Sequence, residues 1–485
     1  MQLINIGHKF DYETEKVLRI FFPFEKINIL HEYSENDDTV ICEIINGSKV
    51  KVSANVLGKE ETESEDLTSL DDSELALARC LYRCISKITG YKSDWGILTG
   101  IRPAKLFSSI TDKSGIDTAK QIFKNEFLVS DKKTELCKVT SKSEKCITDL
   151  SRPQSFSLYV SVPFCPSRCS YCSFVSHSVE SAKGIIPEYL RLLGKELVET
   201  GKIAKELGLR LETVYIGGGT PTSITADQLR ELLFSVRANF DFSFVREFTV
   251  EAGRPDTIDR EKLEVIKSAG VTRISINPQS MNDRVLEIIG RRHTAKATEE
   301  AFLLAREVGF NNINTDIIAG LDGDTEESFK NTVNRIISLC PESVTVHSLS
   351  VKRAANITRK GELPDINRGI TARAMVDFAR EALEQNGFLP YYMYRQSKTV
   401  GNLENVGYAK KGFEGLYNVY IMDETHTILA CGASAVTKLK EPNGNNIERI
   451  FNFKYPYEYI SRFSEIIERK DGVRAYYLKN KIWRI

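Results

Sequence analysis

Three cysteines stand close together in one short segment, Pro163–Phe174, with C-x3-C-x2-C spacing. They are Cys165, Cys169 and Cys172. Short spacings in a turning loop let three thiolates converge on one site, so the segment predicts a metal centre. A structural zinc is usually closed by four ligands, and the nearby candidate for a fourth is His177. Three sulfur ligands fit a four-iron cluster with one free iron better than they fit zinc or purely structural thiols.

A second cysteine pair, Cys80 and Cys84, lies four residues apart in a helix expected over 73–90. No other cysteine or histidine stands nearby at ligand spacing. We therefore expect both thiols to act as small apolar groups on a buried helix face. The ten cysteines of this 485-residue chain are too few for a disulfide scaffold, and they indicate a reducing, cytoplasmic compartment.

Charge and hydropathy exclude several classes of protein. The 66 basic and 66 acidic side chains give zero net charge, which argues against a nucleic-acid-binding protein. The N-terminus lacks the charged-then-apolar order of a signal peptide, and no run of about 18 apolar residues predicts a membrane span. The length predicts two or three domains.

From residue 157 onward, strand-like and helix-like segments alternate six times. The expected strands are Leu158–Val162, Thr213–Ile216, Glu247–Glu251, Arg273–Ile276, Asn312–Ile317 and Ser343–His347. The expected helices lie near 185–207, 225–238, 259–269, 282–307 and 325–339. This repeat predicts a parallel sheet with right-handed crossovers, either doubly wound or a partial barrel. In both, functional residues gather at the carboxyl ends of the strands.

The flanking segments read differently. Residues 1–58 predict a small α/β unit with a hairpin turn at Asn46-Gly47. The acidic stretch Glu60–Asp72 is expected to be a solvated linker, and Tyr417–Ala430 predicts two strands. The predicted domains are 1–150, an α/β domain without evident chemistry, 151–350, the repeat, and 351–485, a lobe that covers it.

Unusual residues follow several of the expected strands. Gly217-Gly218-Gly219 would let the backbone approach a ligand closely, although a plain tight turn is the simpler alternative. Glu251 closes an apolar strand, and a carboxylate buried there needs a partner unless the strand end is solvated. Asp316 interrupts another apolar strand. His293 is expected to be a helix-end residue rather than a catalyst.

These residues carry a family resemblance. The cysteine spacing, with the aromatic Tyr171 before the last cysteine, resembles the signature of the radical S-adenosylmethionine (SAM) superfamily. Three segments together resemble the oxygen-independent coproporphyrinogen III oxidase family: Tyr159–Cys165, Gly217–Thr222 and Asp316–Leu321. Two more, Trp95–Pro103 and Gly401–Tyr408, resemble its HemZ-like branch, also called coproporphyrinogen dehydrogenase. The resemblance implies an α/β fold: a partial six-stranded (β/α)6 barrel with an N-terminal α/β domain and a C-terminal α+β lobe.

The resemblance also implies cofactors and their contacts. A [4Fe-4S] cluster is expected on the three cysteines, with SAM bound beside it. The residues expected at SAM are Tyr159, Tyr171, Gly218, Gly219, Thr220, Glu251, Gln279, Arg291 and Asp316. Among them, the glycines and Thr220 would border the methionine moiety and Arg291 would pair with its carboxylate, with Arg292 as the alternative. Asp316 would meet the ribose, and Tyr171 the adenine. Some family members carry a further cysteine where this chain has Phe174.

The implied activity is oxidative decarboxylation of coproporphyrinogen III to protoporphyrinogen IX, with an unidentified reductant such as flavodoxin or ferredoxin. Two other functions stay open: a haem-processing radical SAM enzyme, and a haem-binding chaperone that keeps the cluster. A tetrapyrrole substrate has anionic propionates. Candidate partners for them are Arg395 within Tyr391–Gln396 and the amides of Asn402–Asn405, although these residues could equally pack the lobe onto the barrel.

Overall fold

The computed structural model describes residues 1–34, 38–67, 69–174, 176–351, 366–441, 444 and 446–480, which belong to two compact units. The first unit consists of Met1–Lys142, Gly361–Ala374 and Met393–Asn405, and the second of Ser143–Lys360, Met375–Tyr392 and Val406–Ile485. The predicted three-domain division, with boundaries near 150 and 350, is a different partition and stays a prediction. None of the described helices combines the length and apolar composition that crossing a bilayer needs.

The first unit contains a five-stranded sheet in the order β2-β1-β3-β4-β5. Its strands are β1 (Gln2–Ile6), β2 (Asn28–Leu30), β3 (Thr39–Ile45), β4 (Lys49–Val56) and β5 (Lys59–Asp66). The predicted hairpin is confirmed, because β3 pairs antiparallel with β4 through Asn46 and Gly47, whose φ angles are 50° and 65°. Its helices are α1 (Asp11–Phe21), α2 (Ser73–Thr89), α3 (Pro103–Ser114), α4 (Ile116–Gln121), a π-helical turn (Ile122–Glu126) and α5 (Asp131–Thr148), which runs on into the second unit. Cys80 and Cys84 are fully buried on α2, as expected for apolar roles.

The linker predicted over Glu60–Asp72 is wrong for its first half. This half forms the edge strand β5, which pairs antiparallel with β4 along its whole length. Two of its acidic side chains form ion pairs with α2: Glu65 pairs with Arg79, and Glu61 lies 3.0 Å from Lys87. An exposed edge strand rich in acidic residues has the same composition as a linker. The pairing of β5 with β4 could therefore not be predicted from the sequence.

The second unit is built on an eleven-stranded sheet in the order β14-β15-β13-β12-β11-β10-β9-β6-β16-β17-β18. The strands are β6 (Ser155–Val162), β9 (Arg210–Gly218), β10 (Glu247–Gly253), β11 (Arg273–Ile276), β12 (Ile313–Ala319), β13 (Ser343–Ser348), β14 (Leu389–Arg395), β15 (Glu404–Ala409), β16 (Thr427–Cys431), β17 (Val436–Lys440) and β18 (Ile447–Phe451). The six predicted strands, β6 and β9 to β13, run parallel to one another, which confirms the α/β repeat, and β15 pairs antiparallel with β13. The described strands form an open sheet, with β14 and β18 at its two ends.

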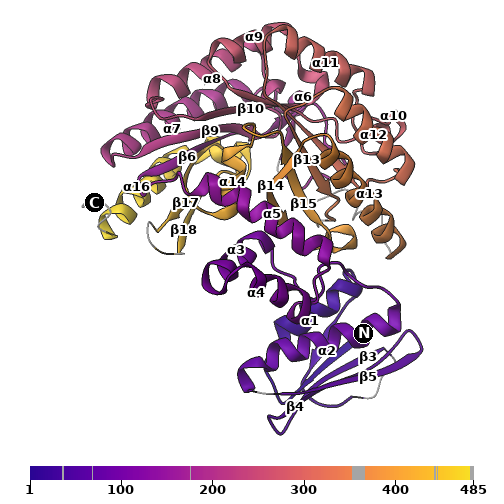
Figure 1. The fold of residues 1–485 in the computed structure, drawn as a ribbon. Helices are drawn as coiled ribbons and strands as arrows, with labels where there is room; N and C mark the ends of the chain where they lie inside the picture. Colours follow the sequence, from indigo (N-terminus) through magenta and orange to yellow (C-terminus); the bar gives the residue numbers. More distant parts are fainter. Residues whose placement is uncertain are drawn as a thin grey trace. The chain divides into compact units, whose positions relative to one another are not determined.

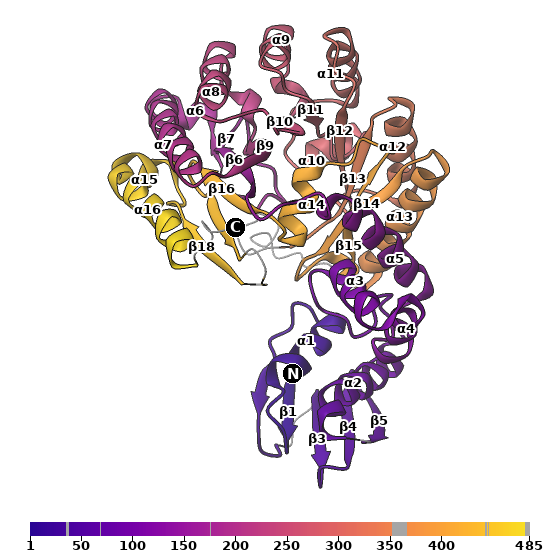
Figure 2. The same cartoon turned by 60° about the vertical axis from the view of Figure 1, so that its left-hand side comes forward.

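Helices cover the outer face of this sheet (Figures 1 and 2). They include α6 (Val179–Ala182), α7 (Ile186–Glu206), α8 (Ala226–Asn239), α9 (Arg260–Ser268), α10 (Asp283–Ile288), α11 (Ala295–Glu307) and α12 (Glu326–Ser338). The single helix predicted over 282–307 is wrong. Gly290, with a φ of 78°, follows α10, and the Thr294 hydroxyl accepts a hydrogen bond from Ala297 N to cap α11. Arg291 therefore lies in a loop rather than within a helix.

The C-terminal segment extends the same sheet. Its helices are α13 (Ile366–Gln385), α14 (Leu416–Asp423), α15 (Pro456–Ser461) and α16 (Phe463–Lys479). Only the second of the two strands predicted over Tyr417–Ala430 exists, as β16, and the first is the helix α14. Glu247, at the start of β10, accepts hydrogen bonds from Leu416 N and Tyr417 N. A carboxylate at a helix N-terminus satisfies free backbone donors, and this tertiary contact overrides the β propensity of the segment.

Side chains alternate between the two faces of the six parallel strands. On β6, Phe156, Leu158, Val160 and Val162 join the core that packs against the helices. The residues between them, Ser155, Ser157, Tyr159 and Ser161, must face the inner side because strand side chains alternate. The same alternation places Tyr215, Glu251 and Asp316 on the inner face. The inner face is therefore polar. The predicted site residues lie on this face, toward the carboxyl ends of the strands.

A buried ion pair fixes β16 beside β6. The ammonium of Lys470 on α16 lies 2.8 Å from a carboxylate oxygen of Glu196 on α7, and both side chains are at most 2% exposed. The other carboxylate oxygen of Glu196 accepts a hydrogen bond from Gly432 N, directly after β16. Removing one member of such a pair leaves an uncompensated buried charge.

We therefore expect Lys470→Met to lower the free energy of unfolding by about 3–5 kcal/mol, measured by urea denaturation. Lys479→Met is the matched control on the same helix, because Lys479 is 74% exposed and lies 3.6 Å from Glu448. It should cost less than about 1 kcal/mol. Equal losses in the two variants would contradict a specific role for the Glu196–Lys470 pair.

Candidate functional site

The three cysteines lie on the loop that follows β6. Cys165 ends the short strand β7 (Phe164–Cys165), which pairs with β8 (His177–Ser178), and its Sγ lies 3.5 Å from Thr220 Oγ1. Burial raises the pKa of the Cys172 thiol to about 11, and Cys169 and Cys165 are near enough to add to that rise. The loop thus brings the three thiols together in a largely desolvated position.

The glycine-rich loop after β9 packs directly against the cysteine loop. Gly219 N donates to Val162 O at 2.9 Å, and Thr220 N donates to Phe164 O at 2.7 Å. A Cβ atom at Gly219 would stand only 2.6 Å from Phe164 O. The close approach that requires glycine here is an approach to the cysteine-bearing strand, which the sequence alone did not indicate.

Glu251 on β10 and Asp316 on β12 both lie on the inner face, with β11 between their strands. Burial is the main cause that raises the pKa of Glu251, to about 7, and the charge of Asp316 raises it further. Tyr215, the neighbour of Tyr159 across the β6–β9 pairing, donates a hydrogen bond to Glu251. Asp316 instead accepts a 2.8 Å hydrogen bond from Asn314 and lies 3.8 Å from His347 Nε2. Despite its burial, these partners hold the pKa of Asp316 below its ordinary value.

Gln279 follows β11 in a left-handed backbone conformation, with a φ of 71°. Its N–H donates to Asp316 O, and its carbonyl accepts from Ile318 N, both at 3.0 Å. This side chain is 7% exposed, and its buried Oε1 has no hydrogen-bond partner among the residues that the structure describes. A buried acceptor left unpaired is costly, so a ligand that donates a hydrogen bond there would remove the penalty.

Arg291 lies in the loop between α10 and α11. Its guanidinium donates to Asn277 O, and Nη2 donates to Tyr171 Oη at 3.0 Å. Burial alone would lower the pKa of this guanidinium, whereas Tyr171 and Cys169 hold it above its ordinary value. Among the described residues no carboxylate pairs with Arg291. Its neighbour Arg292 is exposed, so the geometry favours Arg291 as the predicted carboxylate partner.

Three stacked tyrosines line the inner face, and one of them, Tyr215, is hydrogen-bonded to Glu251. The ring centroids of Tyr215 and Tyr417 are 4.5 Å apart, and that of Tyr159 lies 6.4 Å from Tyr215 and 6.3 Å from Tyr417. Tyr417 comes from α14. Sequence analysis missed Tyr215 and Tyr417, although the position of Tyr215 two residues before the glycine run could have identified it as an inward-facing residue.

Arg395 is not free to receive a substrate carboxylate. It is 4% exposed, donates to the backbone carbonyls of Leu98 and Asn402, and stacks 4.9 Å from the ring centroid of Trp95. Glu404, in the second predicted segment, is buried and accepts from Trp95 Nε1 at 2.7 Å. These contacts support the alternative interpretation, in which Arg395 and Glu404 pack within the protein interior.

The donor set fits an iron–sulfur cluster. Across the described residues, no three Cys, His, Asp or Glu side chains converge as ligands of a single ion would. Thiolates of a four-iron cluster bind different irons, so they stand farther apart than the ligands of one ion. Three neighbouring thiols on one loop suit such a cluster, and the buried, unpaired Oε1 of Gln279 on the same sheet suits an organic ligand that donates a hydrogen bond.

Glu251 gives the site a testable pH dependence. Its pKa of about 7 lies above the ordinary 4.5, so the folded state holds this proton more tightly than the unfolded state. The bound proton stabilises the folded state fully when the pH is below the ordinary pKa of 4.5. This stabilisation is lost as the pH rises through about 7. We expect Glu251→Gln to remove this loss, so its stability relative to the wild type should increase across that interval in urea denaturation. Glu264→Gln, at an exposed position on α9, should change nothing, and parallel pH profiles for Glu251→Gln and wild type would refute the assignment.

The comparisons with known proteins agree with this geometry. The model of the radical SAM superfamily matches residues 159–336. The oxygen-independent coproporphyrinogen-III oxidase-like protein HemZ of Bacillus subtilis is 39% identical over 387 residues, which cover 79% of this chain and 77% of HemZ. The haem chaperone HemW of the same organism is 35% identical over 282 residues, which cover 57% of this chain and 70% of HemW.

A solved structure shows the same fold. Coproporphyrinogen III oxidase (HemN) from Escherichia coli superposes with a TM-score of 0.52 at 22% identity, over 67% of this chain and 72% of that protein. Membership of the superfamily implies a [4Fe-4S] cluster and SAM as cofactors. The chain therefore belongs to the radical SAM superfamily and, within it, to the family of HemZ-like, oxygen-independent coproporphyrinogen III oxidase-like proteins.

Proposed function

We propose that this protein catalyses the oxygen-independent oxidative decarboxylation of coproporphyrinogen III to protoporphyrinogen IX. The observation that carries the proposal is the 39% identity to an oxygen-independent coproporphyrinogen-III oxidase-like protein across 79% of the chain. In this reaction, two propionate side chains lose CO2 and become vinyl groups. The electron donor would be a small carrier such as flavodoxin or ferredoxin.

The residues of the carboxyl strand edge would hold the cofactors. Cys165, Cys169 and Cys172 would ligate the cluster, which together with SAM supplies one-electron reductive chemistry that ends in hydrogen abstraction from the substrate. Tyr171 would contact the adenine of SAM. The other residues proposed at SAM are Tyr159, Gly218, Gly219, Thr220, Glu251, Gln279, Arg291 and Asp316.

Two charges in the site lack a partner of opposite sign among the described residues. Arg291 has no carboxylate, and Glu251 has no cation within ion-pair distance. The methionine end of SAM carries an ammonium and a carboxylate. A ligand of this kind would compensate both charges, and charge-assisted hydrogen bonds of this type are stronger than neutral ones.

The inner face also restricts water. The tyrosine stack occupies the space beneath Glu251, and the Tyr215 hydroxyl remains bonded to the carboxylate. Asp316, held ionised by Asn314 and His347, is suited to accept hydrogen bonds from ribose hydroxyls. These contacts would orient SAM and keep its reactive end away from bulk water.

A haem-binding chaperone is the second candidate function. The observation that favours it is the 35% identity to the haem chaperone HemW. That similarity covers 57% of this chain, against 79% for HemZ. A haem-processing radical SAM enzyme remains the third possibility, and one substrate assay separates the three.

Cluster content tests the proposed ligands. We expect anaerobically reconstituted protein to bind about four irons, and Cys→Ala changes at 165, 169 or 172 to abolish the cluster. Iron and sulfide analysis measures this. Cys84→Ala is the matched control, because Cys84 is fully buried in the core of the first unit. Equal iron loss in the control would mean that the ligands are assigned wrongly.

The substrate assay combines coproporphyrinogen III, SAM and a chemical reductant under anaerobic conditions. We expect a product lighter by two CO2 with their hydrogens, detected by mass spectrometry, and dependent on SAM, reductant and Cys172. SAM cleavage stimulated by haem, with no loss of CO2 from coproporphyrinogen, would instead favour the haem-processing enzyme. Tight haem binding without SAM turnover would favour the chaperone.

A further inference from the structure

A charge pair between a buried arginine and a partly exposed aspartate follows β10 directly. Arg254 is 3% exposed and binds Asp256 through two parallel hydrogen bonds, Nε to Oδ1 at 2.9 Å and Nη2 to Oδ2 at 2.8 Å. Neither residue was singled out in the sequence, and neither belongs to the proposed SAM contacts. A bidentate pair satisfies both charges but is weak evidence for stability, so its role depends on what else the guanidinium contacts.

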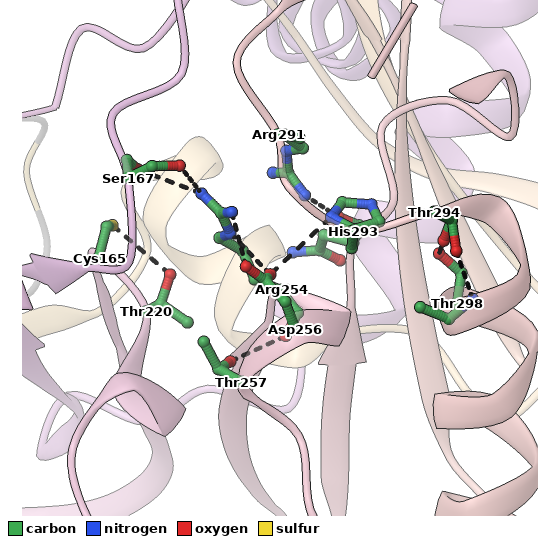
Figure 3. A network of polar contacts seen from close by, with 12 residues as sticks. Cys165, Ser167, Thr220, Arg254, Asp256, Thr257, Arg291, His293, Thr294 and Thr298 are labelled. Carbon is green, nitrogen blue, oxygen red and sulfur yellow. Dashed lines mark hydrogen bonds and ion pairs between the residues drawn. The ribbon is translucent and has the colours of Figure 1, made fainter. Parts of the chain in front are cut away.

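The free side of the Arg254 guanidinium points at the cysteine loop (Figure 3). Its Nη1 donates to Ser167 O at 3.1 Å and to Ser167 Oγ at 2.8 Å. Ser167 lies between Cys165 and Cys169, and its hydroxyl donates in turn to Gly290 O at 3.1 Å. One side chain thus links the end of β10, the middle of the cysteine loop and, through Ser167, the loop that carries Arg291.

Arginine suits this position better than lysine. Its planar fork of five N–H donors can bind a carboxylate on one edge and a carbonyl and hydroxyl on the other at the same time. Lysine presents a single ammonium on a flexible stem, which cannot span both sets of acceptors in one fixed geometry. Arg254 therefore holds the backbone of the cysteine loop in place, in addition to placing a positive charge beside it.

The pair also acts electrostatically on the thiols. Arg254 is near enough to Cys165 for its charge to act there. Burial would raise the pKa of Asp256, but Arg254 holds it below its ordinary value. His293 lies 3.9 Å from Asp256, and burial lowers its pKa to about 3, so it adds no charge near neutral pH. Of the two charges, the guanidinium contacts the cysteine loop directly, and the carboxylate lies behind it.

We propose that Arg254 and Asp256 are positioning residues for the cysteine loop, and that their paired charges set how readily a cluster bound there accepts an electron. The proposal rests on the assignment of the three cysteines as cluster ligands and does not depend on the substrate. Arg254 is 3% exposed, so a change of charge there acts on a nearby redox centre with less screening than in bulk water.

Two single variants should shift the cluster in opposite directions. Arg254→Met leaves the Asp256 carboxylate uncompensated and should make the cluster harder to reduce. Asp256→Asn leaves the guanidinium uncompensated and should make reduction easier. We expect each shift to be about tenfold in the reduction equilibrium, which is ~59 mV for one electron. A redox titration of the anaerobically reconstituted full chain, followed by electron paramagnetic resonance, measures both.

Two further variants test the positioning role. Arg254→Lys keeps the charge but loses the fork, so the midpoint potential should stay near that of the wild type while the shape of the resonance signal changes. Ser167→Ala removes the hydroxyl link alone and should change the signal in the same sense without a large shift in potential. A lysine variant identical to the wild type in both readouts would overturn the positioning role.

Arg306→Met is the matched control for loss of stability. Arg306 makes the same types of contact, since its Nη2 lies 3.0 Å from both carboxylate oxygens of Glu342 and donates to Cys340 O at 2.8 Å. It should lower the melting temperature without moving the cluster potential. Shifts of equal sign in Arg254→Met and Asp256→Asn, or none in either, would overturn the proposal. A wild-type protein that binds no iron would overturn the cluster assignment with it.

Discussion

The pairing of β6 with β9 is the contact on which the rest of the site depends. Its register sets Ser161 opposite Gly217 and Val162 opposite Gly218, so the cysteine loop and the glycine loop leave the sheet side by side. Hydrogen bonds from Gly219 and Thr220 then continue the contact into the loops. A slip of one residue would turn every inner side chain outward, because side chains alternate with a period of two. The apolar residues that pack against the helices make such a slip costly.

The same alternation explains why one sheet can be both a core and a site. The outer face is closed by helices and carries apolar residues, so its burial stabilises the fold. The inner face can then carry hydroxyls, amides and carboxylates, which must satisfy one another or a ligand. Most of them do so: Arg273 donates to Asn314 and Ser343, and Asp316 accepts from Asn314. The atoms left without partners, above all Gln279 Oε1, mark where a ligand would be expected.

Local sequence signals predicted the repeat and the cysteine loop well, because both are short-range patterns. The strands alternate over a few residues, and the three cysteines lie within eight positions of one another. Tertiary contacts account for the errors. The segment at Tyr417 reads as a strand but is a helix capped by Glu247, a residue 170 positions away. The contact of Arg254 with Ser167 could not be predicted from its neighbours in the sequence, because Ser167 lies 87 positions away on a different loop. Arg395 looked like a binding residue only because its burial was invisible in the sequence.

The charges of the described inner face also constrain where a tetrapyrrole could sit. Its arginines are already engaged: Arg254 with Asp256, Arg273 with Asn314 and Ser343, and Arg291 with Tyr171 and the backbone of Asn277. Arg291 is the one of these three without an acidic or side-chain amide partner, and the proposed SAM carboxylate would use it. A substrate with several propionates would therefore have to find its cationic partners above the strand ends rather than on the inner face. The inner face would then bind the cofactor, and the residues that select the substrate would lie on the loops around it. Such a division would let loops change their substrate contacts while the sheet beneath them keeps its own, because loops vary more readily than the sheet that supports them.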